Sequence, residues 1–247
     1  MQPNQIDPQS KGRLIKMYNH LKNFITSLIL ILPFIAFAAY ADSRVYAVID
    51  LPPYGCEPSS EVHCINTKIS QIIADAIDEG NSTIQAFPYP RAVHMFESGK
   101  STILVALMNK RLMKQAHVFD LYSVIFYVVA MERTVPSKSS AAIALLNGAD
   151  AHKEIASSID ATTVEVNNYQ QIIMMLKAHR LDYAIIPRIV YESEVKGALD
   201  NVKIVSEHRL PVLLYVNKKE SQYLGKIRDA VSQLSIQTSE QYQYLFP

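Results

Sequence analysis

Two apolar runs near the start of the chain each end in a proline-tyrosine turn, and this repeat constrains the fold most. The run 45–49 (VYAVI) leads into Asp-Leu-Pro-Pro-Tyr-Gly, and the run 84–87 (IQAF) leads into Pro-Tyr-Pro-Arg. Between them, apolar residues at positions i, i+4, i+7 and i+8 from Ile65 predict an amphipathic helix. A strand, a helix and a second strand in this order indicate a βαβ unit and a parallel sheet.

Side chains suited to ligand binding follow the expected strands. Because open α/β sheets bind ligands beyond the carboxyl ends of their strands, we expect Tyr54, Tyr89 and Arg91 to line one crevice. Aromatic and basic residues also follow later apolar runs, namely Arg111, Tyr169 and Arg188. Rings and guanidinium groups hold small polar or anionic molecules, so the pattern predicts a ligand of that kind.

Several of these residues also have a structural explanation. Tyr54 and Tyr89 could simply seal the edge of the sheet with their hydroxyls in water. Arg111 follows Lys110 and could belong to a solvated basic face. Arg91 opens an expected helix, where a cation opposes the helix dipole, and this unfavourable placement favours a functional role.

The amino-terminal segment indicates export. Residues 24–40 form an uncharged apolar run that is preceded by Lys22 and overlaps the motif Ala-Tyr-Ala at 39–41. This pattern predicts a signal peptide spanning residues 1–41 and a mature periplasmic chain from Asp42. The alternative is an uncleaved membrane anchor, for which the run is near the lower limit of length.

Cys56 and Cys64 are the only cysteines. A single pair in an exported chain predicts a disulfide, here one that closes the loop between the first strand and the first helix. A metal site that also uses His63 is the alternative, but this spacing matches no common zinc pattern.

Composition and motifs argue against several function classes. The expected mature chain carries 20 basic and 22 acidic side chains, so there is no electrostatic case for nucleic acid. No GxGxxG or Walker A pattern supports a nucleotide, and we expect no cofactor and no metal. GxSxG and HExxH are absent too, so no catalytic residue is predicted, although a triad assembled from distant residues stays open.

The remainder of the chain predicts more strands and helices. The run Tyr122–Met131 is too long for one short strand and is interpreted as a crossing between two lobes. A possible boundary follows at 132–140, and Asn168 is expected to cap a helix. Further strands are expected at 102–107, 141–146, 164–166, 181–186, 202–205 and 212–216, with short and closing helices at 91–98 and 221–234.

The motifs DLPPYG, PYPRA, ESGK, VFDLYS, VNNYQQ and RLDYAIIPR, in this order, resemble the bacterial extracellular solute-binding proteins of family 3. The resemblance implies the type II periplasmic binding protein fold, in which two α/β lobes are joined by a double crossover. It places the lobes at 42–128 with 211–247, and at 129–210. It implies ligand roles for Tyr54, Arg91, Tyr122, Asn147, Tyr169 and Arg188.

The resemblance also implies a biological role. We expect a monomer that traps a small molecule for an inner-membrane transporter or a sensor. Amino-acid binders of the family usually carry a Thr-x-x-Arg motif and a late acidic residue, whereas Met-Asn-Lys-Arg and Pro187-Arg188 stand here. These departures argue against an α-amino acid ligand. Two alternatives remain, an enzyme on the same fold and a degenerate member that binds a protein partner.

Overall fold

The computed structural model describes residues 44–62, 64–78, 82–132, 141–199 and 201–241, the last seven of these by their backbone only. The expected signal peptide, His63, Gly80 and most of the expected boundary segment (133–140) lie outside the described residues. Within the described residues, no helix combines the length and the apolar character needed to cross a membrane.

The predicted βαβ unit is confirmed. Strands β1 (Val45–Ile49) and β2 (Thr83–Phe87) pair in parallel, residue for residue over their whole length. Helix α2 (Ile65–Asp78) connects them and buries its apolar face, including Ile69 and Ile73. Burying a side chain of this size contributes about 1.5–3 kcal/mol relative to leaving it exposed, so the apolar periodicity fixes which face of the helix meets the sheet.

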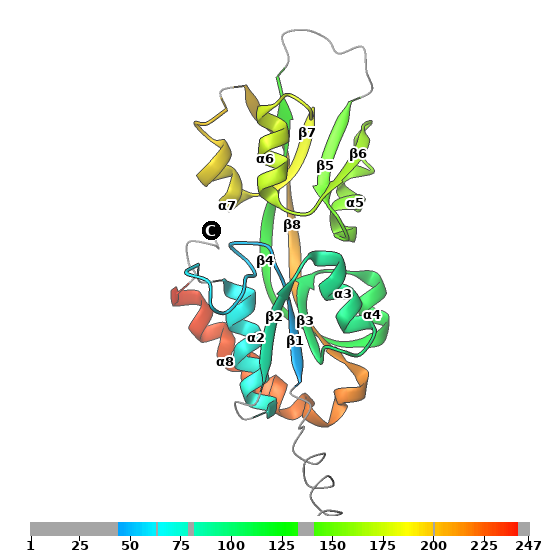
Figure 1. Cartoon of the computed structure of the whole chain (residues 1–247), viewed down its shortest axis with the longest axis vertical. Coiled ribbons are helices and arrows are strands. Elements are labelled where there is room, and N and C mark those ends of the chain that lie inside the picture. Colours follow the sequence, from blue (N-terminus) through cyan, green and yellow to red (C-terminus); the bar gives the residue numbers. More distant parts are fainter. Residues whose placement is uncertain (1–43, 63, 79–81, 133–140, 200, 242–247) are drawn as a thin grey trace, which may run out of the picture. The chain divides into compact units, whose positions relative to one another are not determined.

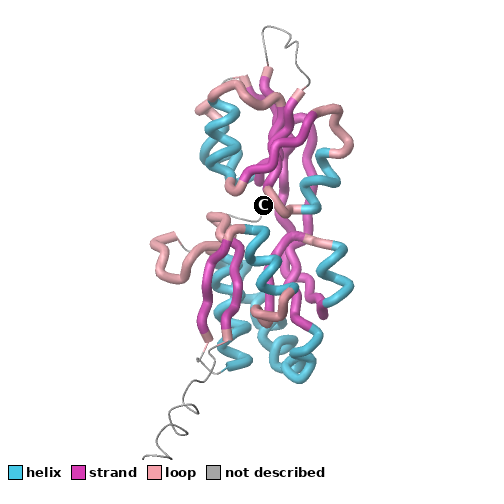
Figure 2. The backbone as a smooth tube through the Cα atoms, turned by 45° about the vertical axis from the view of Figure 1, so that its right-hand side comes forward, coloured by secondary structure: helices cyan, strands magenta, loops and turns pink. Residues whose placement is uncertain are grey.

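Two lobes can be distinguished, and helices flank the strands of each (Figure 2). The first lobe contains, besides β1, β2 and α2, the elements α3 (Tyr89–Glu97), β3 (Ile103–Leu107), α4 (Lys110–Gln115), η2 (Lys218–Tyr223) and α8 (Leu224–Gln241). The second contains β5 (Ala142–Leu146), α5 (Asp150–Ala156), β6 (Thr162–Val166), α6 (Tyr169–Lys177), β7 (Tyr183–Pro187), α7 (Arg188–Val190) and the π-helical η1 (Tyr191–Val195).

Two long antiparallel strands, β4 (Ala116–Met131) and β8 (Val202–Asn217), run from one lobe into the other (Figure 1). They belong to a sheet with the order β3-β8-β4-β7-β5-β6. The end of β8 pairs with β3 in the first lobe, and the end of β4 pairs with β7 in the second. This pair of strands is the expected double crossover; the boundaries expected near residues 128 and 210 fall inside these strands and stay predictions.

Some expected elements differ from the observed ones. We expected separate strands at 202–205 and 212–216, but β8 is continuous because its polar middle and Pro211 stay in the ladder with β4. Proline weakens a strand assignment since it donates no hydrogen bond, yet the Pro211 carbonyl still accepts one from the Met108 amide. Strand β4 starts six residues before the expected run, and the short helices α4 and α5 were not predicted.

Candidate functional site

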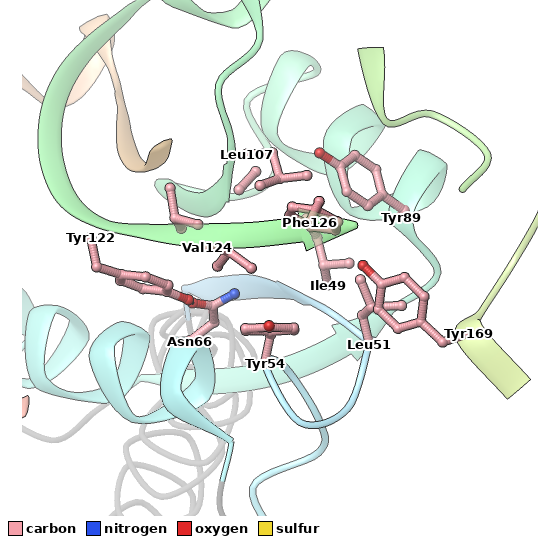
Figure 3. A pocket seen from close by; sticks show the side chains of 12 residues that line it. Ile49, Leu51, Tyr54, Asn66, Tyr89, Leu107, Tyr122, Val124, Phe126 and Tyr169 are labelled. Atoms are coloured by element: carbon pink, nitrogen blue, oxygen red, sulfur yellow. The ribbon is translucent and has the colours of Figure 1, made fainter. Parts of the chain in front are cut away.

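A small cavity of about 30 Å³ lies where the two lobes meet β4 and β8 (Figure 3). Its volume is enough for about one water molecule. Aliphatic and aromatic side chains dominate its wall, with four tyrosines and one asparagine as the polar members. The lining residues are Ile49, Leu51, Tyr54, Asn66, Tyr89, Ala106, Leu107, Tyr122, Val124, Phe126, Tyr169 and Val212.

Tyr54 is held in place by the loop that follows β1. The predicted disulfide between Cys56 and Cys64 is confirmed and closes this loop. The Thr67 hydroxyl donates to the Cys56 carbonyl at 2.7 Å and accepts from the Cys56 amide at 3.0 Å. The Asn66 amide donates to the Tyr54 carbonyl at 2.7 Å. These bonds tie the loop to the first turn of α2, and the Tyr54 side chain is 6% exposed.

Tyr89 follows β2, as the sequence predicts, but it is the first residue of α3, which starts two residues before the expected helix at 91–98. The residue is 5% exposed. The turn Asn147–Gly148 of the second lobe packs against it. A Cβ atom built on Gly148 would lie 3.2 Å from the Tyr89 ring, and Gly148 has a φ of +83°. Glycine therefore allows a close approach between the lobes at a backbone conformation that other residues adopt only with strain.

Tyr169 is the wall residue that the second lobe contributes. It is the first residue of α6, and the predicted cap is confirmed, since the Asn168 carboxamide oxygen accepts from the Gln171 amide at 2.9 Å. The Tyr169 side chain is 3% exposed, and its hydroxyl is buried with no hydrogen-bond partner among the described residues.

The tyrosine hydroxyls differ in their partners. Tyr122, on β4, donates to the Asn66 side-chain oxygen at 2.6 Å. The hydroxyls of Tyr54 and Tyr89 also line the cavity and make no hydrogen bond with another described residue, although only that of Tyr169 is a fully buried atom without a partner. We call these three groups the open hydroxyls. Figure 3 shows the hydroxyl ends of Tyr89 and Tyr169 turned inward, toward Leu107 and Ile49.

Burial keeps the open hydroxyls protonated. Loss of solvation on burial is the main cause that raises the pKa of Tyr54, Tyr89 and Tyr169 above its usual value. The Arg188 charge acts in the opposite direction on Tyr54 but is the smaller effect. The three groups are therefore neutral hydrogen-bond donors and acceptors at any physiological pH.

The arginines expected at the site do not line this cavity. Arg91 is exposed, with its guanidinium 4.9 Å from the centre of the Phe87 ring. Arg111 pairs with Glu97 at 3.0 Å on the surface. Arg188 is partly buried at the start of α7, near enough for its charge to act on Tyr54, but it is not part of the cavity wall. Asn147 lies in the interlobe turn and is likewise not part of the wall.

Direct hydrogen bonds join the lobes beside the cavity. The Asn109 side-chain nitrogen donates to Asp150 at 2.9 Å, and Lys110 pairs with Glu154 at 2.6 Å. We call these two interactions the α4–α5 contact. Sequence reasoning missed Asn109, and also missed Asn66 as the partner of Tyr122. Asn109 directly follows the β3 run and caps α4, a position that could have identified it.

A larger hollow of about 330 Å³ lies between the Pro52–Pro53 segment and the second lobe. Tyr169 lines both this hollow and the cavity. The other residues of its wall come from α6 and its N-cap, from α7 and from η1, namely Asn168, Gln170, Ile189, Val190, Ser193 and Glu194.

Comparison with known proteins identifies the fold. Neither protein-family models nor curated proteins give a match. Among solved structures, the GluR0 ligand-binding core from Nostoc punctiforme in complex with L-glutamate is similar with a TM-score of 0.65 and 15% identity, over 82% of this chain and 98% of that one. The chain has a type II periplasmic binding fold.

Two further structures have the same architecture. An ancestral arginine-binding protein bound to arginine gives a TM-score of 0.64 at 18% identity, over 83% of this chain and 99% of that one. The substrate-binding protein of an amino acid ABC transporter gives a TM-score of 0.61 at 16% identity, over 81% of this chain and 99% of that one. The expected two-lobed α/β fold is thereby confirmed, and at these identities the likeness extends to the fold alone.

Proposed function

We propose that this chain is a periplasmic solute-binding protein that captures a small polar molecule between its two lobes. The observation that carries the proposal is the cavity itself. Its wall combines residues of both lobes and includes the three open hydroxyls, of which that of Tyr169 is fully buried without a partner among the described residues. A buried polar group without a partner costs about 1–3 kcal/mol, which a bound solute would recover.

The proposed mechanism is lobe closure without chemistry. A solute that bonds Tyr54 and Tyr89 in the first lobe and Tyr169 in the second binds the closed arrangement better than an open one, and so shifts the population toward closure. Strands β4 and β8 are the proposed hinges, because they join the lobes. Delivery to an inner-membrane transporter and service as a sensor are both compatible with such a closing receptor.

A ligand screen tests this proposal. At a solute concentration of one hundred times its Kd, binding should stabilise the fold by about 2.7 kcal/mol and raise the Tm by roughly 5–10 °C. Small-angle scattering should show a smaller radius of gyration with the same solute. A rise in Tm without compaction would contradict capture between the lobes.

One observation favours a second candidate, a family member that binds a protein partner. The cavity holds only about 30 Å³, and the α4–α5 contact joins the lobes directly through protein groups. A broad screen of amino acids, organic acids, sugars, peptides and neutral ring compounds that gives no change in Tm would favour this candidate over solute binding.

A further inference from the structure

We infer that the cavity selects an uncharged ring compound carrying hydrogen-bonding groups, and rejects amino acids and other ions. The inference rests on the proposed function, because it names the solute class for the same site. It follows from three features of the cavity, which are the absence of ions in its wall, the placement of the open hydroxyls, and the shape of its apolar surface.

The cavity wall holds no carboxylate, ammonium or guanidinium group among its twelve described residues. A charged solute that enters such a site loses its hydration and gains no opposite charge in return. An α-amino acid carries two charges and would incur this cost twice. An uncharged solute loses only water hydrogen bonds, which the tyrosine hydroxyls can replace.

The open hydroxyls approach the cavity from three separate elements. Tyr54 comes from the loop after β1, Tyr89 from the start of α3 and Tyr169 from the start of α6. Each neutral hydroxyl can donate one hydrogen bond and accept others. A solute with hydrogen-bonding groups on more than one side can therefore join both lobes.

The remaining wall is formed by rings and branched aliphatic side chains. Phe126 and the four tyrosines provide aromatic surface, and Ile49, Leu51 and Val124 provide aliphatic surface (Figure 3). Aromatic rings stack or meet edge to face with other rings and gain about 0.5–1.5 kcal/mol beyond simple burial when they do. A flat ring is the shape that such a wall favours. Because the cavity holds only about one water molecule, the lobes must lie further apart around a bound ring than they do in this structure.

Arg188 is the cation that most nearly supports a different conclusion. It is partly buried, and its guanidinium forms no hydrogen bond or ion pair with the described residues. An anion held by Arg188 would, however, lie outside the cavity wall and leave the Tyr169 hydroxyl buried and unpaired. The open hydroxyls favour a neutral solute inside the cavity.

Matched pairs of neutral and charged compounds test the inference. Nicotinamide with nicotinate, and benzamide with benzoate, differ by an amide against a carboxylate on the same ring; uracil, thymine, L-glutamate, L-glutamine and L-arginine complete the panel. Calorimetric titration of the mature protein should show binding of neutral ring compounds, with each carboxylate at least about 100-fold weaker than its amide.

The outcomes separate the inference from the proposed function. Tighter binding of a carboxylate or an amino acid, with compaction in scattering, would overturn the inference while the solute receptor stands. If no compound in the panel or in the broad screen binds, both fail.

Single-atom variants locate the bound compound. Tyr54→Phe, Tyr89→Phe and Tyr169→Phe each remove a hydroxyl that no described group uses, so the fold should persist while affinity for the neutral compound falls by about 3- to 10-fold. Tyr46→Phe is the matched control, because its hydroxyl bonds Asp78 away from the cavity, and it should lower stability without changing affinity. Retained binding in all three cavity variants, with a large loss in Arg188→Gln, would overturn the inference.

Discussion

The Asn109 side chain has two roles. Its oxygen caps α4, and its nitrogen donates a hydrogen bond to Asp150 across the lobes at 2.9 Å. Asp150→Ala removes the interlobe bond and keeps the cap, so it should favour lobe opening and cost about 1 kcal/mol of stability. Scattering should show a larger radius of gyration for this variant in the absence of solute.

The exposed pair Lys110–Glu154 gives the control for that measurement. An exposed ion pair contributes about 0–1 kcal/mol, so Glu154→Ala should change the radius of gyration and the stability less than Asp150→Ala. An equal effect of both variants would mean that the partly buried Asn109–Asp150 bond has no special part in closure.

The disulfide between Cys56 and Cys64 should stabilise both the fold and the site. Closing so short a loop contributes about 2.5 kcal/mol in the chain-entropy model, so the double variant Cys56→Ser/Cys64→Ser should lose about that much in urea unfolding. Because the loop positions Tyr54, the variant should also bind solute more weakly. Free thiols in the freshly isolated protein would contradict the bond.

His152 should make stability depend on pH. Burial lowers its pKa from 6.5 to about 3, and its ring packs edge to face on Phe126 with centroids 4.8 Å apart. The folded state keeps the ring neutral while the unfolded chain takes up a proton below pH 6.5. Stability should therefore be complete above pH 6.5 and fall by about 1.4 kcal/mol per pH unit below it, down to about pH 3.

Urea unfolding at pH 7.5 and 5.5 checks the His152 contribution. His152→Gln should remove about 1.4 kcal/mol of the difference in unfolding free energy between the two pH values, whatever its own stability. The same acid sensitivity in the variant and the parent would assign the effect to other groups.

The sequence predicted those parts of the structure that depend on neighbouring residues in the chain. Apolar periodicity predicted β1, α2 and α6, because burial of one face decides those segments locally. The position of Tyr54 and Tyr89 just after a strand likewise predicted that they line one crevice, and both line the cavity between the lobes. The arginines could not be placed in this way, because a long and flexible side chain can reach several partners. Arg91 lies over the Phe87 ring and Arg111 pairs with Glu97, instead of entering the cavity.

Short elements, and pairs of residues far apart in the sequence, could not be predicted for a related reason. Helix α5 has seven residues, too few for a clear apolar period, and α4 has six. The bond between Tyr122 and Asn66 joins residues 56 positions apart, so neither residue carries a local signal of the other. The continuity of β8 through Pro211 depends on pairing with β4 over its whole length.

The export hypothesis predicts a mature amino terminus at Asp42. Terminal sequencing of the exported protein should give Asp-Ser-Arg-Val, because the small residues before Asp42 form the expected cleavage site. A membrane-bound product that retains residues 24–40 would instead support the uncleaved anchor.

Gly148 offers the sharpest test of interlobe packing, because a second glycine provides a matched control. Gly148 and Gly197 have φ values of +83° and +78°, so alanine at either position should cost about 1–2 kcal/mol through backbone strain. At Gly148 the added methyl also lies 3.2 Å from the Tyr89 ring, whereas at Gly197 no atom lies within 4 Å.

The two variants should therefore unfold at similar temperatures but differ in closure. Gly148→Ala should push the lobes apart at Tyr89, increase the radius of gyration and weaken binding of a neutral ring compound. Gly197→Ala should bind as the parent does, since its methyl meets nothing. Equal binding in both variants would mean that the Tyr89 ring moves aside for the methyl group while the lobes stay closed. The packing of Asn147–Gly148 on Tyr89 would then not limit closure.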